Sequence, residues 1–390
     1  MIEEAAKITI FTPVYNRAYA IEKLYRSLLR QSEYAFEWLI VDDGSTDNIT
    51  ELVSQWIKNT RQFKIRFYQQ KNGGKHRAVN YGVLKSSYDA FFIVDSDDYL
   101  EDDAMENILR YWSDIRGNSQ FAGISGMRRR SSGEIIGGRP YFDDYIDATN
   151  LEREKWGLNG DKAEIYKTEI LRKFPFPEYE NEQFITEAVV WNKIAYEGYK
   201  NRWINKSFIV CDYLQDGLTA KGEQLLIDNP KGWAHYMRLQ KKYGLIGKKE
   251  YLWYCLKFYE SERTKFAKDE FEKLLDLEAA EFDEILSCYN EFLQKLSAIC
   301  ADRHIGIYGF GKWGRELKGC FDRLGIYVDY VIDRKFANIK EIKAFSINMD
   351  LPKTDVIFIA LKDDVEAVME TLKEKMPGTE IVLFRELLKG

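Results

Sequence analysis

The chain has 390 residues, of which 45% are hydrophobic and 31% are charged, and its formal net charge is −6. A chain of this length is expected to form two or three domains, and the composition is typical of a globular protein, which excludes disordered and fibrous classes. The acidic balance argues against a nucleic-acid partner, because a phosphate-binding surface brings an excess of Lys and Arg.

The five cysteines are scattered and include no Cys-x-x-Cys pair, which argues against a disulfide or zinc framework and favours reduced thiols in a cytoplasmic protein. The first residues lack a basic segment followed by an apolar stretch, so no signal peptide is expected. No apolar run approaches the ~18 residues that span a bilayer.

The first 110 residues alternate strands with helices. Their hydrophobic spacing predicts strands at 8–11, 37–41, 63–68 and 90–94, and helices at 20–31, 47–56 and 75–84. This alternation predicts an α/β fold with a mostly parallel sheet covered by helices on both faces. Ligands of such sheets bind beyond the carboxyl ends of the strands, and the unusual polar clusters of this chain stand at those ends.

The rest of the chain is less regular before the alternation returns. Loops are expected at 128–138 and 175–183, a helix at 186–196 and a strand at 206–211, and residues from about 221 to 300 are almost purely helical. A second, smaller α/β unit then begins at His304, with strands at 305–308, 327–332, 355–360 and 381–384 and helices at 312–324 and 365–375. The predicted domains are therefore 1–220, 221–300 and 301–390.

Asp95-Ser96-Asp97-Asp98 directly follows the apolar strand at 90–94. Carboxylates clustered behind a buried strand are costly unless something cationic neutralises them, and a divalent metal that holds a phosphate does so. A lone Asp-x-Asp is also common in solvated turns, so two further segments are needed to support this interpretation.

Those segments are Thr12-Pro13-Val14-Tyr15-Asn16-Arg17, after the first strand, and Asp42-Asp43, after the second. Pro13 fixes a turn, and Tyr15 can wall one side of a flat base; a plain strand-to-helix turn is the alternative. The two carboxylates can accept hydrogen bonds from an imide N–H or a ribose hydroxyl, although capping of the next helix by Ser45 or Asp47 is also expected.

In order and spacing, the three segments resemble the family-2-like inverting glycosyltransferases of the GT-A fold, over residues 7–220. The resemblance implies that Asp42 or Asp43 contacts the nucleoside base, that Asp95 lies near the ribose, and that Asp97 binds the Mg²⁺ or Mn²⁺ that bridges the donor diphosphate. The donor-binding set predicted in this way is Pro13, Val14, Tyr15, Arg17, Asp42, Asp43, Gly74, Lys75, Arg77, Asp95 and Ser96.

Gly74, Lys75 and Arg77 belong to a segment, residues 72–80, that resembles the glycine-containing turn of this family beside the donor. Glycines let the backbone approach a phosphate, and a helix N-terminus with Lys75 or Arg77 offers positive potential. A solvated basic turn is the competing interpretation. His76 has no second ligand at metal spacing, so a zinc role is not expected.

The catalytic base is expected on the acceptor side, because displacement by an acceptor hydroxyl needs one base. Residues 184–191 resemble the acidic signature of the family at the start of the acceptor-side helix, which makes Glu187 the predicted base. Thr186 is expected to cap that helix and to place Glu187 in its first turn, where complementing the dipole is the alternative role. The chain departs from the commoner Glu-Asp pair, so Glu182 and Asp161 stay as alternatives.

Further predictions concern the acceptor side, a covering loop and the C-terminal unit. Asp161 is a candidate for acceptor positioning, and Asp216 for a loop that covers the diphosphate. In the C-terminal unit, Gly309, Gly311 and Gly314 open a helix after a strand, and Asp333 ends the next strand, where a ribose-binding acid is expected. This unit resembles the Rossmann-like domains appended to sugar-modifying enzymes. It shows no hydride-transfer residues, so a structural or assembly role is favoured over NAD(P) catalysis.

The function predicted from the sequence is transfer of a sugar from a nucleotide-sugar, with UDP favoured, to a hydroxyl of a surface glycan, with Mn²⁺ or Mg²⁺ as cofactor. The alternatives are an NAD(P)-linked sugar-nucleotide oxidoreductase and a non-catalytic scaffold with a degenerate transferase domain. The expected partners are the donor and a glycan or lipid-linked glycan acceptor. Peripheral membrane contact through Lys241, Lys242, Lys248 and Lys249 competes with an ordinary solvated helix face. The sugar, linkage and oligomeric state stay open.

Overall fold

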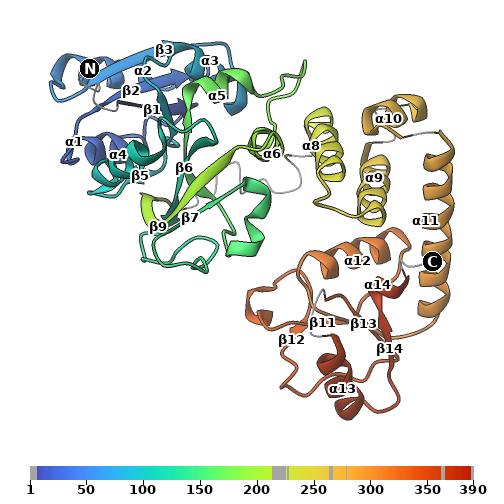
Figure 1. Cartoon of the computed structure of the whole chain (residues 1–390). Helices are drawn as coiled ribbons and strands as arrows, with labels where there is room; N and C mark the ends of the chain where they lie inside the picture. The colour runs from blue at the N-terminus through green and yellow to red at the C-terminus, as the bar shows by residue number, and fades with distance from the viewer. Residues whose placement is uncertain are drawn as a thin grey trace. The chain divides into compact units, whose positions relative to one another are not determined.

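The structure is a computed structural model and describes residues 7–212, 225, 228–262, 267–277, 279–361 and 365–387. The chain divides into two compact units, Met1–Asp276 and Leu277–Gly390. The predicted α/β class is confirmed, because a large sheet flanked by helices forms the first unit and a second, parallel sheet lies in the other (Figure 1). By their contacts, α8 (Pro230–Lys242) to α10 (Lys268–Leu275) belong to the first unit and α11 (Ala279–Cys300) belongs to the second. The three-part division at 220 and 300 stays a prediction.

Four parallel strands form the N-terminal half of the large sheet, as the hydrophobic spacing predicts. They are β1 (Ile8–Val14), β2 (Phe36–Asp42), β3 (Lys64–Gln69) and β4 (Ala90–Ile93). The helices between them are α1 (Glu22–Leu29), α2 (Ile49–Asn59) and α3 (Lys75–Lys85). Each crossover helix lets the next strand run parallel, so the carboxyl ends of all four strands meet at one edge of the sheet.

The irregular region completes the same sheet, in the order β3-β2-β1-β4-β8-β6-β9-β5, with β7 paired to β9. Its strands are β5 (Tyr99–Leu100), β6 (Phe121–Arg129), β7 (Tyr145–Ala148), β8 (Lys162–Lys167) and β9 (Lys200–Val210). Its helices are α4 (Ala104–Ile115), α5 (Thr168–Lys173) and α6 (Ala188–Tyr196), followed by α8 (Pro230–Lys242), α9 (Lys248–Glu262) and α10 (Lys268–Leu275). β8 is antiparallel to both β4 and β6, which places it in the middle of the sheet.

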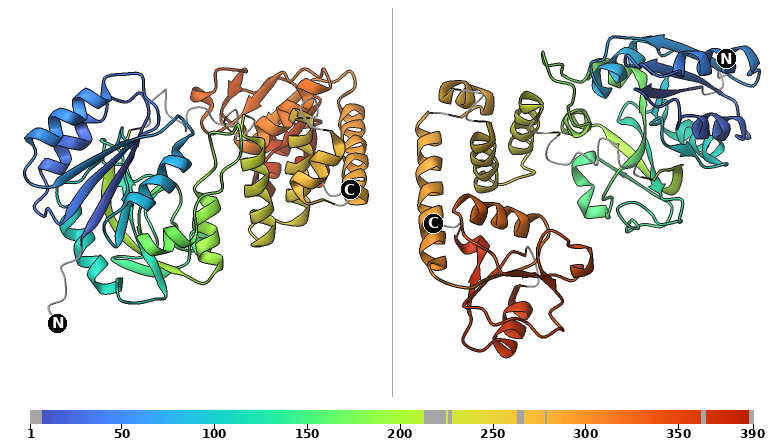
Figure 2. Two further views of the ribbon diagram at one scale, coloured as in Figure 1. Left: turned by 90° about the horizontal axis from the view of Figure 1, so that it is seen from above. Right: turned by 180° about the vertical axis from the view of Figure 1, so that it is seen from behind.

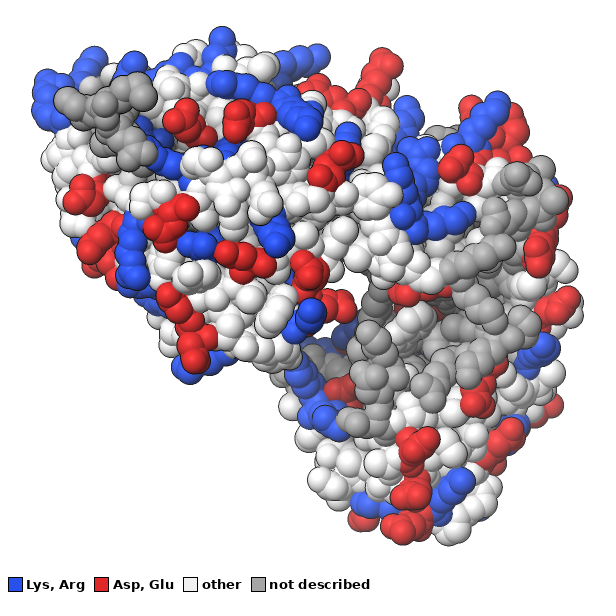
Figure 3. Space-filling view, viewed as in Figure 1, with Lys and Arg blue, Asp and Glu red and all other residues white. Residues whose placement is uncertain are grey.

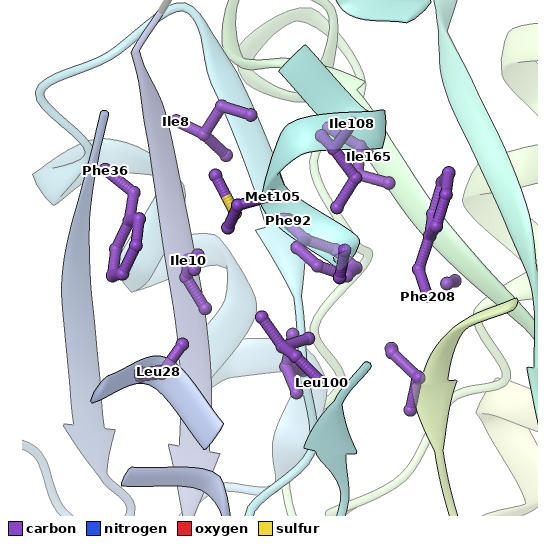
Figure 4. Packing of buried hydrophobic residues seen from close by; sticks show 14 of the residues in the cluster. Ile8, Ile10, Leu28, Phe36, Phe92, Leu100, Met105, Ile108, Ile165 and Phe208 are labelled. Atoms are coloured by element: carbon purple, nitrogen blue, oxygen red, sulfur yellow. The ribbon is translucent and has the colours of Figure 1, made fainter. Parts of the chain in front are cut away.

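Helices lie on both faces of this sheet (Figure 2), and a hydrophobic cluster is buried on each face. On one face Ile10, Phe92 and Ile165 pack against Leu28 of α1 and Met105 of α4 (Figure 4). The opposite face carries their sequence neighbours Phe11, Phe91 and Tyr166. These pack against Val79 of α3 and Trp191 of α6. This two-residue alternation decides which face each polar residue of β8 occupies.

The C-terminal unit is built on five parallel strands in the order β12-β11-β10-β13-β14. They are β10 (Ile305–Tyr308), β11 (Tyr330–Ile332), β12 (Ala344–Phe345), β13 (Val356–Ile359) and β14 (Glu380–Leu383), with helices α11 (Ala279–Cys300), α12 (Lys312–Arg323), α13 (Val365–Lys375) and α14 (Phe384–Leu387). The Rossmann-like classification of this unit stays a prediction. Among the described residues, no helix combines the length and apolarity needed to cross a bilayer.

Candidate active site

A cavity of about 810 Å³ opens at the edge of the large sheet where β1, β2 and β4 end. Turns after these strands line it, together with the N-terminus of α3, part of β8 and the segment before α6. The structure thus brings together most of the residues that the sequence singles out, namely Pro13, Val14, Tyr15, Arg17, Asp43, Gly74, Lys75, Asp95, Ser96, Asp97, Asp161 and Glu187. Asp42, Arg77 and Glu182 do not line it, and Asp216 lies outside the described residues.

The turn after β4 holds three carboxylates against two basic side chains. The ammonium nitrogen of Lys75 lies 2.5 Å from Asp95 Oδ1, and Arg128 Nη1 lies 2.9 Å from Asp98 Oδ2 and 3.7 Å from Asp95 Oδ2. Burial opposes ionisation of Asp95, but Lys75 and Arg128 outweigh it and hold its pKa below the usual value. Asp95 is therefore a charged, well-anchored group at the floor of the turn.

Asp97 differs from its neighbours because none of the ion pairs among the described residues involves it. Burial, followed by the charge of Asp95, raises its pKa above the usual value. The described residues contain no group of three or more His, Cys, Asp or Glu side chains arranged to hold a metal. Magnesium, however, is usually bound by one or two carboxylates together with substrate phosphates and water. The Asp97 carboxylate fits that mode of binding.

Lys75 also connects the turn after β4 to the predicted base, since its Nζ lies 2.9 Å from Glu187 Oε1. Although burial disfavours the charged amine, the carboxylates of Asp95 and Glu187 raise the pKa of Lys75 above its usual value. Helix α6 begins at Ala188, two residues after the predicted start at 186. Glu187 is the N-cap residue, because the first α-helical hydrogen bond joins Trp191 N–H to the Glu187 carbonyl oxygen. Its side chain forms no capping hydrogen bond. The prediction that Thr186 caps α6 and places Glu187 in the first turn is therefore wrong.

Asp42 and Asp43 build the frame around the cavity. The fully buried Asp42 accepts hydrogen bonds from Ser45 N–H (2.9 Å) and Gln69 Nε2 (3.0 Å). Asp43 accepts from the N–H groups of Gly73 (2.9 Å) and Gly74 (2.7 Å), and so fastens the glycine turn to the end of β2. A contact of either residue with a nucleoside base stays a prediction.

Gly74 is required by its surroundings. Its φ of 94° lies in the left-handed region, and a Cβ there would lie 1.8 Å from the carbonyl oxygen of Gln183. The glycine turn consequently packs directly on the backbone of the segment that leads to Glu187. The close approach that the sequence analysis assigns to a phosphate is thus used, at least in part, by the protein itself.

Arg77 and Glu182 hold that segment in place from outside the cavity. Arg77 donates to the carbonyl oxygens of Gly73 (2.6 Å), Tyr179 (2.5 Å) and Glu182 (2.5 Å). The Glu182 carboxylate accepts from the N–H groups of Lys231 (2.7 Å) and Gly232 (2.8 Å), which are free donors at the start of α8. Both residues are thus anchors for the loop before Glu187.

Several charged residues of the cavity were missed by the sequence analysis, among them Arg128 and Glu164. Arg128 of β6 pairs with Asp98, and Glu164 of β8 faces the cavity with 7% of its surface exposed. Burial raises the pKa of Glu164 to about 7. The only sequence signal for either is a charge within a strand, and the strands were not recognised because 121–211 lacks a regular hydrophobic period.

The glycine turn of the C-terminal unit is engaged in its own packing. Asp333 Oδ2 accepts from Phe310 N–H and its Oδ1 from Lys335 N–H, both at 2.7 Å. A Cβ at Gly314 would lie 2.0 Å from the Gly309 carbonyl oxygen, so a glycine there lets α12 pack on β10. Nucleotide binding by Gly309, Gly311, Gly314 and Asp333 stays a prediction.

Comparison with known proteins supports the family resemblance for the N-terminal part. Residues 9–168 match the model of the family described as glycosyl transferase family 2. An uncharacterized glycosyltransferase of Rickettsia felis is 37% identical over 131 residues, which cover 33% of this chain and 21% of that protein. Glycosyltransferase GlyA of Streptococcus pneumoniae is 34% identical over 185 residues (44% and 26%), and hyaluronan synthase of Pasteurella multocida is 36% identical over 111 residues (28% and 11%).

The chain thus spans about a fifth of the length of the Rickettsia felis protein. Among solved structures, S. aureus TarS 1-349 in complex with UDP-GlcNAc is 18% identical with a TM-score of 0.49, covering 74% of this chain and 81% of that one. The mannosyltransferase PcManGT from Pyrobaculum calidifontis is 17% identical with a TM-score of 0.44, covering 83% and 86%.

Proposed function

We propose that this chain is a metal-dependent, inverting glycosyltransferase that moves a sugar from a UDP-sugar to a hydroxyl group of a surface glycan. The observation that carries the proposal is the arrangement of Asp95, Asp97, Lys75 and Glu187 around one cavity at the carboxyl ends of the parallel strands. The family match over 9–168 and the names of the relatives support sugar transfer as the reaction.

On the donor side, Tyr15 is half exposed and lines the cavity, so its ring can lie against the nucleoside base. Asp97 would hold the Mn²⁺ or Mg²⁺, which when bound neutralises the charge of the diphosphate. Lys75 and the N-terminus of α3 add positive potential on the same side. These groups stabilise the leaving nucleotide as its negative charge develops.

On the acceptor side, Glu187 is the base. As the acceptor oxygen bonds to the anomeric carbon and the bond to the diphosphate breaks, Glu187 takes the hydroxyl proton. Attack from the face opposite the leaving group inverts the anomeric centre. The ion pair with Lys75 holds the Glu187 carboxylate in one orientation toward the donor side, so proton acceptance and departure of the nucleotide occur around a single ammonium group.

The direct test is a screen of nucleotide-sugars for hydrolysis and transfer by the purified full chain, with Mn²⁺, Mg²⁺ or EDTA. We expect turnover of at least one UDP-sugar that EDTA abolishes. A Glu187→Gln variant in the same screen should still bind UDP with Mn²⁺ by calorimetry but lose transfer. Undiminished turnover in EDTA would contradict the metal, and full transfer by the variant would contradict the base.

A further inference from the structure

Glu164 is a buried carboxylate that no side chain or backbone group of the described residues hydrogen-bonds or pairs with. It lies on β8, in the middle of the sheet, and by alternation shares a face with Tyr166, whose ring stacks on Trp191 of α6 with centroids 4.3 Å apart. Glu164 therefore points to the side of the sheet from which α6 and Glu187 border the cavity, and it lines that cavity itself. Its backbone belongs to the β6–β8 ladder, but its carboxylate forms no hydrogen bond and no ion pair among the described residues.

The contrast with Glu37 shows that this sheet can satisfy a buried glutamate. Glu37 of β2 is 1% exposed and accepts hydrogen bonds from Thr9 Oγ1 (2.9 Å) and Ser87 N–H (3.0 Å), with Arg66 Nη1 at 3.2 Å. No such set surrounds Glu164. An ionised carboxylate buried without partners costs more free energy than a neutral amide or an apolar side chain at the same place, so Glu164 does not serve the stability of the fold.

Arg128 is the basic residue whose charge acts most strongly on Glu164, but its side chain already donates hydrogen bonds to other groups. Its Nε donates to the Lys162 carbonyl (2.9 Å), and its Nη1 donates to Asp98 (2.9 Å). Burial raises the pKa of Glu164, and although the charges of Arg128 and Arg153 oppose this shift, the charge of Glu187 adds to it. Both carboxylates line the same cavity. A partner for Glu164 must therefore come from the cavity itself.

The surroundings indicate the chemistry of that partner. Polar side chains of Asn150, Arg153 and Asp161 line the cavity together with Glu164. A carboxylate accepts hydrogen bonds, and the hydroxyl groups of a sugar are neutral donors that can enter beside Glu187 without adding a charge. An anionic group would instead meet two carboxylates here, which disfavours a phosphate.

We propose that Glu164 is an acceptor-binding residue, whose carboxylate accepts a hydrogen bond from a hydroxyl group of the sugar acceptor and so positions that acceptor beside Glu187. The inference rests on the proposed function and adds to it the residue that recognises the acceptor. Glu164 contacts the acceptor only, so binding and hydrolysis of the donor do not depend on it.

The test compares Glu164→Gln with Glu37→Gln, the same change at a buried but partnered glutamate of the same sheet. Donor hydrolysis by water and transfer to a panel of p-nitrophenyl glycosides are measured with the nucleotide-sugar that the wild type turns over. We expect Glu164→Gln to raise the acceptor KM roughly 5- to 10-fold, because the amide oxygen still accepts a hydrogen bond but lacks the charge that strengthens it. The donor KM and the rate of hydrolysis should stay within about twofold of the wild type. Glu37→Gln should leave the acceptor KM unchanged.

An unchanged acceptor KM in Glu164→Gln would overturn the proposal, and so would a parallel fall in donor affinity and hydrolysis, because Glu164 would then act on the donor. A fold defect is recognised by thermal unfolding of the variant at pH 8. Absence of any turnover by the wild type would instead overturn the proposed function, and this inference with it, before any variant is compared.

Discussion

Among the described residues, Asp97 is the carboxylate of its turn that takes part in no ion pair. Asp95 and Asp98 are held by Lys75 and Arg128, whereas Asp97 sits near negative charge that raises its pKa. A cation bound with the donor would relieve that repulsion, which explains why three acidic residues can share so small a volume.

Replacing Asp97 with Ala is therefore expected to reduce donor hydrolysis and transfer by roughly 100-fold or more, because the proposed metal would lose its protein ligand. The melting temperature should not fall, since a repelled carboxylate is removed. Asp102→Ala is a matched control, because Asp102 is 76% exposed in its surface pair with Arg30. Rates and metal requirement within twofold of the wild type for Asp97→Ala would contradict this role.

The raised pKa of Glu164 also predicts how the free energy of unfolding changes with pH. Its pKa is about 7 in the folded protein against an ordinary 4.5, so the folded state binds the proton more tightly than the unfolded state. Glu164 does not destabilise the folded state below pH 4.5, where its carboxyl is protonated in both states. The destabilisation grows as the pH rises to 7, where the folded carboxyl ionises. Glu164→Gln should therefore raise the free energy of unfolding at pH 8 by up to about 3 kcal/mol, and hardly at pH 4. Urea unfolding at both pH values measures this difference; a variant less stable than the wild type at pH 8 would contradict it.

At the scale of elements, the glycine turn before α3 and the loop before α6 form one unit. Asp43 fastens the turn to β2, Gly74 packs on the Gln183 carbonyl, and Arg77 donates to three carbonyl groups of the two segments. Lys75 and Glu187 extend from these segments toward each other. The ion pair of the site thus depends on backbone packing rather than on the two side chains alone.

Gly74→Ala tests that packing. The added Cβ must displace the backbone near Gln183, so we expect lost transfer activity and a decrease in the free energy of unfolding of roughly 1–3 kcal/mol beyond that of the control. Gly133→Ala is the control, because Gly133 has a similar φ of 92° but open space around its Cβ position. It should cost only the ~1–2 kcal/mol of left-handed strain. Equal stability and equal activity of the two variants would show that the close approach is not needed.

Helix α8 supports the same loop from the other side. Glu182→Ala removes the carboxylate that caps its first turn, so the free energy of unfolding should fall by about 1 kcal/mol. Turnover should fall several-fold, because the segment before Glu187 loses an anchor. Glu180→Ala changes an exposed residue of the same segment and should alter neither quantity. Chemical denaturation and initial rates are measured side by side for both variants. Equal values for the two variants would contradict the anchoring role of Glu182.

At the scale of the whole molecule, the two units differ in what their ligand-facing turns leave available. The first unit keeps Asp97 and the walls of a large cavity, whereas Asp333 in the second already accepts two backbone N–H groups. Charge follows a different pattern on the surface. In the view of Figure 3, Lys and Arg gather over α8, and a membrane contact by this helix stays a prediction.

This difference predicts how the full chain responds to ligands. UDP with Mn²⁺ should raise its melting temperature, by an amount that corresponds to about 2.7 kcal/mol at 100 times Kd. NAD(H) should cause no shift, because the carboxylate expected to bind ribose is occupied. A thermal-shift series with UDP alone, UDP with Mn²⁺, and NAD(H) makes the comparison. A shift by NAD(H) alone would favour the oxidoreductase.

The local pattern of the chain determined the parts that depend on near neighbours. The strands β1 to β4, the helices between them and the C-terminal alternation were all predictable, because hydrophobic spacing is a property of consecutive residues. The polar turns at strand ends followed from the same pattern, since parallel strands align their carboxyl ends. β8 escaped because a strand buried on both faces and carrying Lys162 and Glu164 has no regular period.

Only the tertiary structure decided how those residues are used. Asp42 and Asp43 are adjacent in sequence and both are buried, yet only Asp43 lines the cavity. Lys75 meets Glu187 across more than 100 residues, and among the described residues the carboxylate of Glu164 meets no hydrogen-bonding or ion-pairing group. Such pairings depend on contacts between distant segments, whose geometry is set by packing and not by the order of residues along the chain.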